Sequence, residues 1–190
     1  MTRVAILGDS HVPFREDEVP EQVWEDVRES DLTVHMGDFD SRKALEEFVE
    51  ECQAMIAVRG NMDPSSVELE EAELFDLEDV TFFVSHGTDG RRQVQEHAEY
   101  NDADVAVFGH THQVYDEVDG GVHMLNPGTC TGADPAEDTT YMVAEVEDGE
   151  YEVELLEVED GDEEPDGGDA VDVEDEGGEE EPETEEDPTE

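Results

Sequence analysis

Three short apolar runs, each ending at a glycine followed by a polar residue, constrain the fold of this chain more than any other feature. They span residues 4–7, 32–36 and 55–59, and the residues that follow them are Gly8-Asp9, Gly37-Asp38 and Gly60-Asn61. Between the runs, apolar residues recur at helical spacing, as at Val19, Val23 and Val27, and Ser41 is a plausible N-cap for the next helix. Strands that alternate with helices predict parallel βαβ units and therefore an α/β layered fold.

The second half of the chain predicts a β-rich layer with one helix. Residues 74–77 and 80–84 flank Glu78-Asp79 as a hairpin would, residues 90–100 suit a helix, and residues 105–108 suit a buried strand. Short β segments follow at 114–118, 122–125, 140–147 and 150–158. The last two alternate apolar and acidic residues, as half-solvated antiparallel strands do. We therefore expect one folded domain over residues 1–158.

The charge is extreme and unevenly distributed. The chain has 60 acidic and 8 basic residues, for a net charge of -52. Residues 159–190 hold 19 of the acids and no base, which predicts a disordered acidic tail and leaves residues 1–158 at -33. Like charges at this density destabilise a compact domain in dilute buffer but are screened in molar salt. With Lys43 as the single lysine, the balance resembles proteins of salt-loving archaea; an acidic mesophilic protein would explain the tail alone.

Several classes of protein are excluded by the same composition. No apolar run approaches the roughly 18 residues of a membrane span, and the first run is too short for a signal peptide. Cys52 and Cys130 stand alone and cannot make a disulfide framework. We therefore expect a cytoplasmic protein, in a high-salt cytoplasm. A surface this negative also argues against a membrane partner and against a broad nucleic-acid-binding face.

Seven residues with nitrogen or oxygen ligand atoms follow the ends of five predicted strands. They are Asp9, His11, Asp38, Asn61, His86, His110 and His112. Ligands of open α/β sheets bind outside the carboxyl ends of strands, so these side chains are expected to meet at one rim of the sheet. Imidazole, carboxylate and amide donors without thiolate suit Mn²⁺, Fe²⁺, Ni²⁺ or Zn²⁺ better than an all-oxygen Ca²⁺ site. Seven ligands exceed one tetrahedral ion and suit two ions about 3.5–4 Å apart, bridged by a carboxylate.

Taken singly, these residues have simpler explanations. A Gly-Asp pair after a strand is usually a turn, and His86 alone would be a hydrogen-bonded loop residue. His110 and His112 are a stronger signal, because a His-x-His pair in an extended chain directs both imidazoles to one face. The joint placement at five successive strand ends favours the metal interpretation.

Five motifs, in this order, resemble those of the calcineurin-like metallophosphoesterase superfamily. They are Gly8-Asp9-Ser10-His11, Gly37-Asp38, Gly60-Asn61, His86-Gly87 and Gly109-His110-Thr111-His112. The chain length, the Arg-Gly-Asn-Met-Asp segment at 59–63 and the Asn-Pro-Gly-Thr turn at 126–129 resemble its small YfcE-like phosphodiesterase branch. The resemblance extends over residues 3–158.

The resemblance implies a four-layered α/β/β/α sandwich that holds two divalent metal ions, Mn²⁺ first, with Ni²⁺, Fe²⁺, Co²⁺ or Zn²⁺ as alternatives. Matched position by position, it implies one metal on Asp9, His11 and His112, a second on Asn61, His86 and His110, and Asp38 as the bridge. The implied activity is hydrolysis of a small phosphodiester, and of monoesters as further substrates, by attack of a metal-bound hydroxide. Asp38 and Asn61 would be the catalytic residues.

Two departures from the family pattern concern the proton donor. Many members carry a histidine directly after the metal-binding asparagine, where this chain has Met62, and a thioether cannot donate a proton. Many also read His-Gly-His where this chain has His86-Gly87-Thr88. The general acid is therefore unassigned, with Asp63 or a metal-bound water as substitutes.

A non-enzymatic alternative stays open at this point. The retromer small subunit resembles this fold and acts as a scaffold, and Met62 favours a catalytically weak or inactive interaction module. Retention of all seven inferred metal ligands favours the enzyme. The physiological substrate and the oligomeric state are not predicted, and a homodimer is left open.

Overall fold

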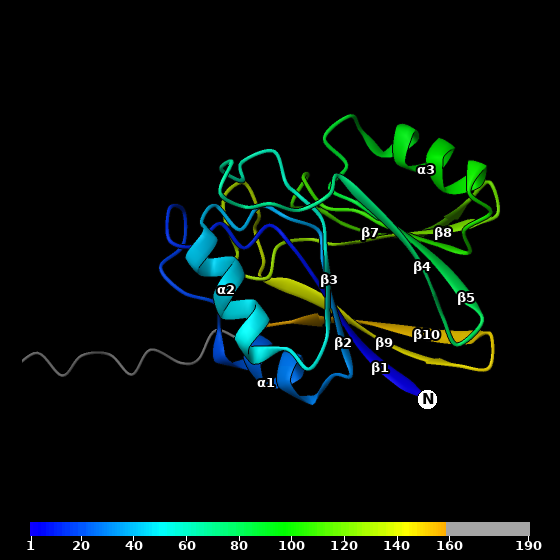
Figure 1. Ribbon diagram of the computed structural model, residues 1–190, viewed down its shortest axis with the longest axis horizontal. Coiled ribbons are helices and arrows are strands. Elements are labelled where there is room, and N and C mark those ends of the chain that lie inside the picture. Colours follow the sequence, from blue (N-terminus) through cyan, green and yellow to red (C-terminus); the bar gives the residue numbers. More distant parts are fainter. Residues whose placement is uncertain (159–190) are drawn as a thin grey trace, which may run out of the picture. The chain divides into compact units, whose positions relative to one another are not determined.

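Two five-stranded β-sheets pack face to face in the computed structural model, which describes residues 1–158 (Figure 1). The order of the first sheet is β10-β9-β1-β2-β3, formed by β1 (Thr2–Leu7), β2 (Leu32–His35), β3 (Met55–Ala57), β9 (Thr140–Glu147) and β10 (Glu150–Glu157). The order of the second is β4-β5-β6-β8-β7, formed by β4 (Ala72–Leu77), β5 (Val80–Ser85), β6 (Val105–Val107), β7 (Val114–Asp119) and β8 (Val122–Pro127). The predicted acidic tail, residues 159–190, lies outside the described residues.

Parallel strands form the centre of both sheets. In the first, β1, β2 and β3 pair in parallel, as the alternation of strands and helices predicts. In the second, β5, β6 and β8 are parallel, and the antiparallel strands β4 and β7 close the edges. Each of the five strands that precede a predicted ligand therefore has a parallel neighbour in its sheet.

The last hairpin differs from the sequence-based expectation. Residues 140–158 were expected in the β-rich second layer, but β9 pairs antiparallel with β1, with Val4 opposite Ala144, and β10 pairs with β9. The alternation of apolar and acidic residues identifies a half-buried strand but not its partner. The outer edge of β1 offers unpaired backbone groups, and the returning hairpin satisfies them.

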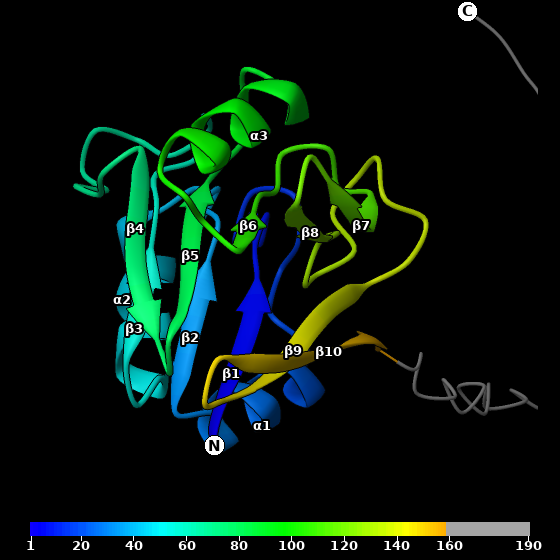
Figure 2. The ribbon, with the colours of Figure 1, turned by 90° about the vertical axis from the view of Figure 1, so that its right-hand side faces the viewer.

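Three apolar clusters define four layers. The first lies between the two sheets and includes Ile6, Val34 and Phe82. The second lies between the first sheet and the helices α1 (Glu21–Glu29) and α2 (Arg42–Glu51). The third lies beneath α3 (Arg91–Tyr100), on the outer face of the second sheet (Figure 2). The layers run α/β/β/α, which confirms the expected fold.

Local sequence signals explain where the helices lie. The Ser41 hydroxyl accepts a hydrogen bond from the Ala44 N–H at 3.0 Å, so Ser41 is the N-cap of α2, as predicted. Val23, Trp24 and Val27 form the buried face of α1. Val19 precedes that helix but packs in the same cluster. Among residues 1–158, no helix is long and apolar enough to cross a membrane.

Candidate metal centre

The seven predicted side chains lie together where β1, β2, β3, β5 and β6 end. The His11 Nε2 atom lies 3.6 Å from Asp38 Oδ2, and His86 Nε2 lies 3.3 Å from the same oxygen. The sequence predicted one rim of one sheet, whereas the structure brings these side chains from both sheets to one edge of the sandwich. Residues far apart in sequence thus share a single site.

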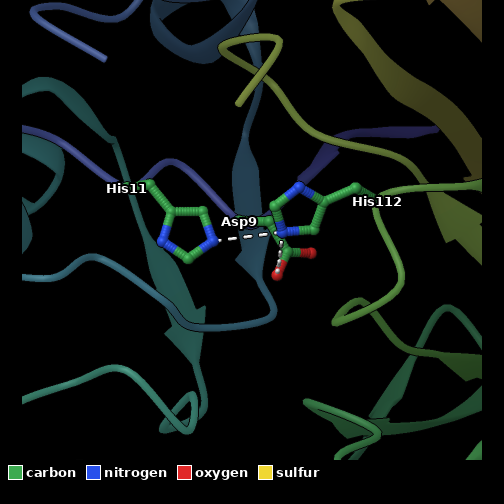
Figure 3. A group of neighbouring side chains, drawn as sticks. All are labelled: Asp9, His11 and His112. Atoms are coloured by element: carbon green, nitrogen blue, oxygen red, sulfur yellow. Dashed lines mark hydrogen bonds and ion pairs between the residues drawn. The ribbon is translucent and has the colours of Figure 1, made fainter. Parts of the chain in front are cut away.

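Asp9, His11 and His112 form the first of two ligand groups (Figure 3). One possible ligand atom from each lies within 4.8 Å of the others. The two imidazoles face each other, with their Nε2 atoms 3.1 Å apart, and His112 Nε2 lies 3.6 Å from Asp9 Oδ1. All three residues are buried. This group has the residue composition expected for the first metal.

Asp9, Asp38 and His86 form the second group, again with ligand atoms within 4.8 Å of one another. Asn61 joins it, because its Oδ1 lies 2.9 Å from His86 Nε2. His110 joins it as well: its backbone N–H donates to Asp9 at 3.0 Å, and its ring centre lies 5.2 Å from that of His86. Asp9 belongs to both groups, and Asp38 contacts a histidine of each.

The hydrogen bonds of the rings fix where three histidines carry their hydrogens. The Nδ1 atoms lie 3.1 Å from the Asp40 carboxylate for His11, 2.7 Å from the Met36 carbonyl for His86, and 2.7 Å from the Ala133 carbonyl for His112. Carboxylate and carbonyl oxygens only accept, so each Nδ1 carries the hydrogen. The neutral His11 and His112 rings present Nε2 lone pairs, whereas His86 Nε2 faces two acceptors, Asn61 Oδ1 at 2.9 Å and Asp38 Oδ2 at 3.3 Å, and carries a second hydrogen when no metal is bound. These lone pairs point toward one another and toward carboxylates. Such a donor set fits divalent cations, which would remove the repulsion among them.

The pKa values show that the site attracts positive charge. Burial raises the pKa of Asp9 to about 7, with the neighbouring Asp38 charge adding to the rise and His86 opposing it. Burial lowers the pKa of His86, but the hydrogen bond with Asp38 and the charge of Asp9 outweigh it, and the net pKa is raised. Burial opposes ionisation of Asp38 too, yet contact with His86 lowers its net pKa. A proton on His86 thus supplies part of the positive charge that a metal ion would bring to the site.

Backbone strain is concentrated at the same residues. Five of the seven have left-handed φ values between 48° and 69°: Asp9, His11, Asp38, His110 and His112. Such values are uncommon for residues other than glycine, and they occur at sites whose surroundings hold the chain in place. Two glycines allow the tight packing, because a Cβ on Gly60 would collide with the Asp38 carboxylate and one on Gly109 with that of Asp9.

A conserved-domain comparison decides the family. The sequence profile of the calcineurin-like phosphoesterase superfamily domain matches residues 2–149. The chain belongs to this superfamily. A probable metallophosphoesterase of Methanothermobacter thermautotrophicus is 30% identical over 158 residues, which cover 80% of this chain and 91% of the relative. A phosphodiesterase of Methanocaldococcus jannaschii is 30% identical over 145 residues, which cover 68% of this chain and 85% of the relative.

A solved structure shows the same calcineurin-like fold. Vacuolar protein sorting 29 from Cryptosporidium parvum superposes with a TM-score of 0.69 at 21% identity, covering 83% of this chain and 97% of the other. At this identity the likeness shows the fold alone. Together with the relatives, it confirms the predicted superfamily, its small phosphodiesterase branch and the four-layered fold.

Two carboxylates of this calcineurin-like site were not assigned a positioning role from the sequence. Both Asp40 oxygens lie 3.1 Å from His11 Nδ1 and orient that ring. The Asp63 carboxylate accepts four backbone N–H bonds, from Asp38, Phe39, Asp40 and Gly60. With its oxygens held in this way, Asp63 positions the loop that carries Asp38, which argues against the role of proton donor considered for it. The only sequence signal was a second Asp shortly after each ligand.

The turn predicted from the Asn-Pro-Gly-Thr segment also supports the site. The Asn126 amide donates to the Gly109 carbonyl at 2.9 Å, just before the two histidines of the last motif. The Thr129 hydroxyl donates to the Asp9 carbonyl at 2.8 Å, and that of Thr131 donates to the Ser10 carbonyl at 2.9 Å. These bonds tie the loops after β1 and β6 to one support.

Other charged and polar residues of the second half and of β2 have partners within the protein. Arg91 stacks on the Tyr115 ring, 4.2 Å from its centre, and Arg92 pairs with Glu96 at 2.9 Å. His35 is fully buried and accepts a hydrogen bond from the Gly37 N–H. Met62 is 48% exposed beside the site, and its side chain has no proton to give.

Proposed function

We propose that this protein is a two-metal-dependent phosphoesterase that hydrolyses phosphodiesters, with monoesters as further substrates. The observation that carries the proposal is the convergence of the Nε2 atoms of His11, His86 and His112 on the Asp9 and Asp38 carboxylates. A buried cluster of this composition is stable only around positive charge. The phosphodiesterase named among the relatives supports the choice of a diester.

The proposed ligand sets are those that the family resemblance implies, and the first coincides with the Asp9–His11–His112 group. Asp9, His11 and His112 would hold one ion, Asn61, His86 and His110 the other, and Asp38 would bridge them. The donor set suits Mn²⁺, with Ni²⁺, Fe²⁺, Co²⁺ or Zn²⁺ as alternatives. When bound, such ions supply Lewis-acid polarisation of a phosphoryl oxygen and acidify water to near neutrality.

The chain's own residues orient the ligands and the substrate. Asp40 holds the His11 ring, and Asp63 holds the loop of Asp38. The Arg15 guanidinium donates to the Asp134 carbonyl at 3.0 Å, next to the Ala133 carbonyl that accepts from His112. Its positive charge acts on Asp9, opposing the rise of that pKa. We assign Arg15 the role of attracting the anionic substrate in an otherwise acidic protein.

The lack of a protonating side chain predicts a preference among substrates. Met62 occupies the position of the usual histidine, and the Asp63 oxygens are held by backbone N–H groups. An ester whose leaving group is already a weak base needs little protonation. Nitrophenyl diesters should therefore be hydrolysed much faster than alkyl diesters.

Replacement of the bridging carboxylate tests the proposal. In Mn²⁺ and molar KCl, the protein should hydrolyse bis(4-nitrophenyl) phosphate, and Asp38→Ala should abolish turnover and reduce the metal content measured by elemental analysis. Asp116→Ala is the matched control, since Asp116 is on the edge strand β7 and pairs with His123 of β8 rather than with any of the seven ligand candidates. Full activity of Asp38→Ala would overturn the proposal.

A scaffold function is the second candidate, because Met62 replaces the usual acid. If the protein bound Mn²⁺, Ni²⁺, Co²⁺ or Zn²⁺ but hydrolysed no phosphoester with any of them, this result would favour the scaffold function. A high-salt cytoplasm remains a prediction from the sequence, and the oligomeric state is not predicted.

A further inference from the structure

A cavity of about 410 Å³ opens beside Asn61 and His86, away from the Asp9–His11–His112 group. Its walls come from four places: the chain after β3, the outer face of β4 and β5, the loop 86–90 that follows β5, and the first turns of α3. Helix α3 contacts β6 and β8 and packs on Phe83 of β5. On the neighbouring edge strand β4, Leu74 is 47% exposed, so the outer face of β4 is left partly uncovered. The cavity is thus a product of the fold, and its size falls within the roughly 300–1,000 Å³ of small-molecule sites.

The lining of the cavity is partly apolar and partly polar. Phe83 packs in the cluster beneath α3 and, with Val94, forms the apolar part. Ser85, Gln93 and His97 add groups that donate and accept hydrogen bonds. This combination suits a flat organic group that carries polar edges.

The charges around the cavity disfavour an anionic occupant. Glu71 and Asp89 line it together with one guanidinium, that of Arg59, which donates to the Asp63 carbonyl at 3.1 Å. Two carboxylates against one cation favour a neutral group. The negative charge of the substrate would instead lie at the proposed metal ions.

We propose that this cavity binds one ester arm of the phosphodiester substrate: an uncharged, hydrogen-bonding organic group of about the size of a nucleoside. The inference rests on the proposed function, since it assumes that the phosphoryl group lies at Asn61 and His86. It specifies the organic part of the substrate, which the metal centre alone does not define. Small alkyl arms would leave the cavity unfilled.

Two substrates with the same leaving group test this inference. Thymidine 5′-(4-nitrophenyl phosphate) and methyl 4-nitrophenyl phosphate carry the same charge and differ in the second arm alone. We expect kcat/KM to be at least about tenfold higher for the thymidine ester, the discrimination that pocket contacts typically provide. Equal values for the two esters would overturn the inference while leaving the proposed function intact.

Filling the cavity provides the matched variant. Gln93→Trp places a bulky ring in the cavity from the exposed surface of α3, and it should raise KM for the thymidine ester while leaving the methyl ester unchanged. Arg92→Trp is the control on the same helix, because the Arg92 side chain is 91% exposed and does not line the cavity. Retained discrimination in Gln93→Trp would overturn the inference.

A binding measurement separates this inference from failure of the catalytic proposal. Should the protein hydrolyse neither ester, thymidine 5′-(methyl phosphate) is titrated to millimolar concentration while the Val94 and Thr88 methyl signals from the cavity lining are followed by NMR. Shifts in the wild-type protein that are lost in Gln93→Trp would support the cavity as a binding site even though the phosphodiesterase proposal had failed. No shift in the wild-type protein would overturn it.

Discussion

The Nε2 atoms of His11 and His112 face each other at 3.1 Å, although 101 residues separate them in the sequence. Neither contact atom carries a hydrogen, because the Nδ1 of His11 is held by Asp40 and that of His112 by the Ala133 carbonyl. Two facing lone pairs repel each other unless a cation lies between them. Metal binding at this pair therefore depends on the orientation of each ring as well as on its presence.

Replacement of Asp40 by asparagine should weaken metal binding. The amide cannot match the carboxylate as an acceptor for His11 Nδ1–H, so the ring loses its fixed tautomer and its basicity. Loss of such a partner typically costs about 10–100-fold in metal affinity. Calorimetric titration of the metal-free protein with Mn²⁺ measures the change.

The control for this prediction is a second Asp–His pair. Asp116 lies 2.6 Å from His123 Nε2 on the surface of the second sheet. Asp116→Asn should leave Mn²⁺ affinity unchanged. Equal affinities in the wild-type protein and Asp40→Asn would show that Asp40 does not orient a ligand.

Asp63→Asn should destabilise the fold as well as the site. Its carboxylate accepts N–H bonds from Asp38, Phe39, Asp40 and Gly60, and an amide would direct N–H donors against some of them. Unsatisfied buried groups cost about 1–3 kcal/mol each, so we expect a loss of about 2–4 kcal/mol in the free energy of unfolding. Denaturant unfolding in molar KCl measures it.

A surface aspartate controls for charge removal. Asp76 accepts a hydrogen bond from the Thr81 hydroxyl at an exposed position, so Asp76→Asn should change stability by less than about 0.5 kcal/mol. If Asp63→Asn were equally mild, the four N–H bonds would not hold the Asp38 loop.

The sequence predicted the fold and the meeting of the ligands because both depend on short-range patterns. A buried strand ending at Gly-Asp is visible within a few residues, and parallel strands bring their carboxyl ends to one edge. The role of Asp40 was not visible, because it depends on the left-handed backbone of the loop, with φ of 63° at Asp40 itself. The pairing of β9 with β1 was missed for a similar reason: alternation marks a strand's faces but not its neighbours.

Stability should rise with salt concentration. Residues 1–158 carry a net charge of -33, and the Debye length falls from about 10 Å at 0.1 M salt to about 3 Å at 1 M. Screening removes repulsion that opposes the folded state, so the urea midpoint should increase with KCl. Sorbitol at equal osmolality is the control, and an equal increase in sorbitol would contradict an electrostatic cause.

The acid stability of the protein should depend on His35. This side chain is fully buried, and desolvation lowers its pKa from 6.5 to about 3. The unfolded chain therefore binds a proton that the folded protein does not, and stability should fall as the pH decreases from 6.5 toward 3. Between pH 6.5 and pH 5 this one group should cost about 2 kcal/mol.

His35→Asn isolates that contribution, because the asparagine oxygen can still accept from the Gly37 N–H that bonds to His35 Nδ1 at 3.1 Å. The variant loses stacking on Phe39 and starts from a lower stability, so the comparison uses the slope of unfolding free energy against pH. Carboxylates elsewhere titrate alike in both proteins and cancel in the difference. The wild-type slope should be steeper between pH 6.5 and 5, and parallel slopes would mean that His35 takes up a proton in the folded state.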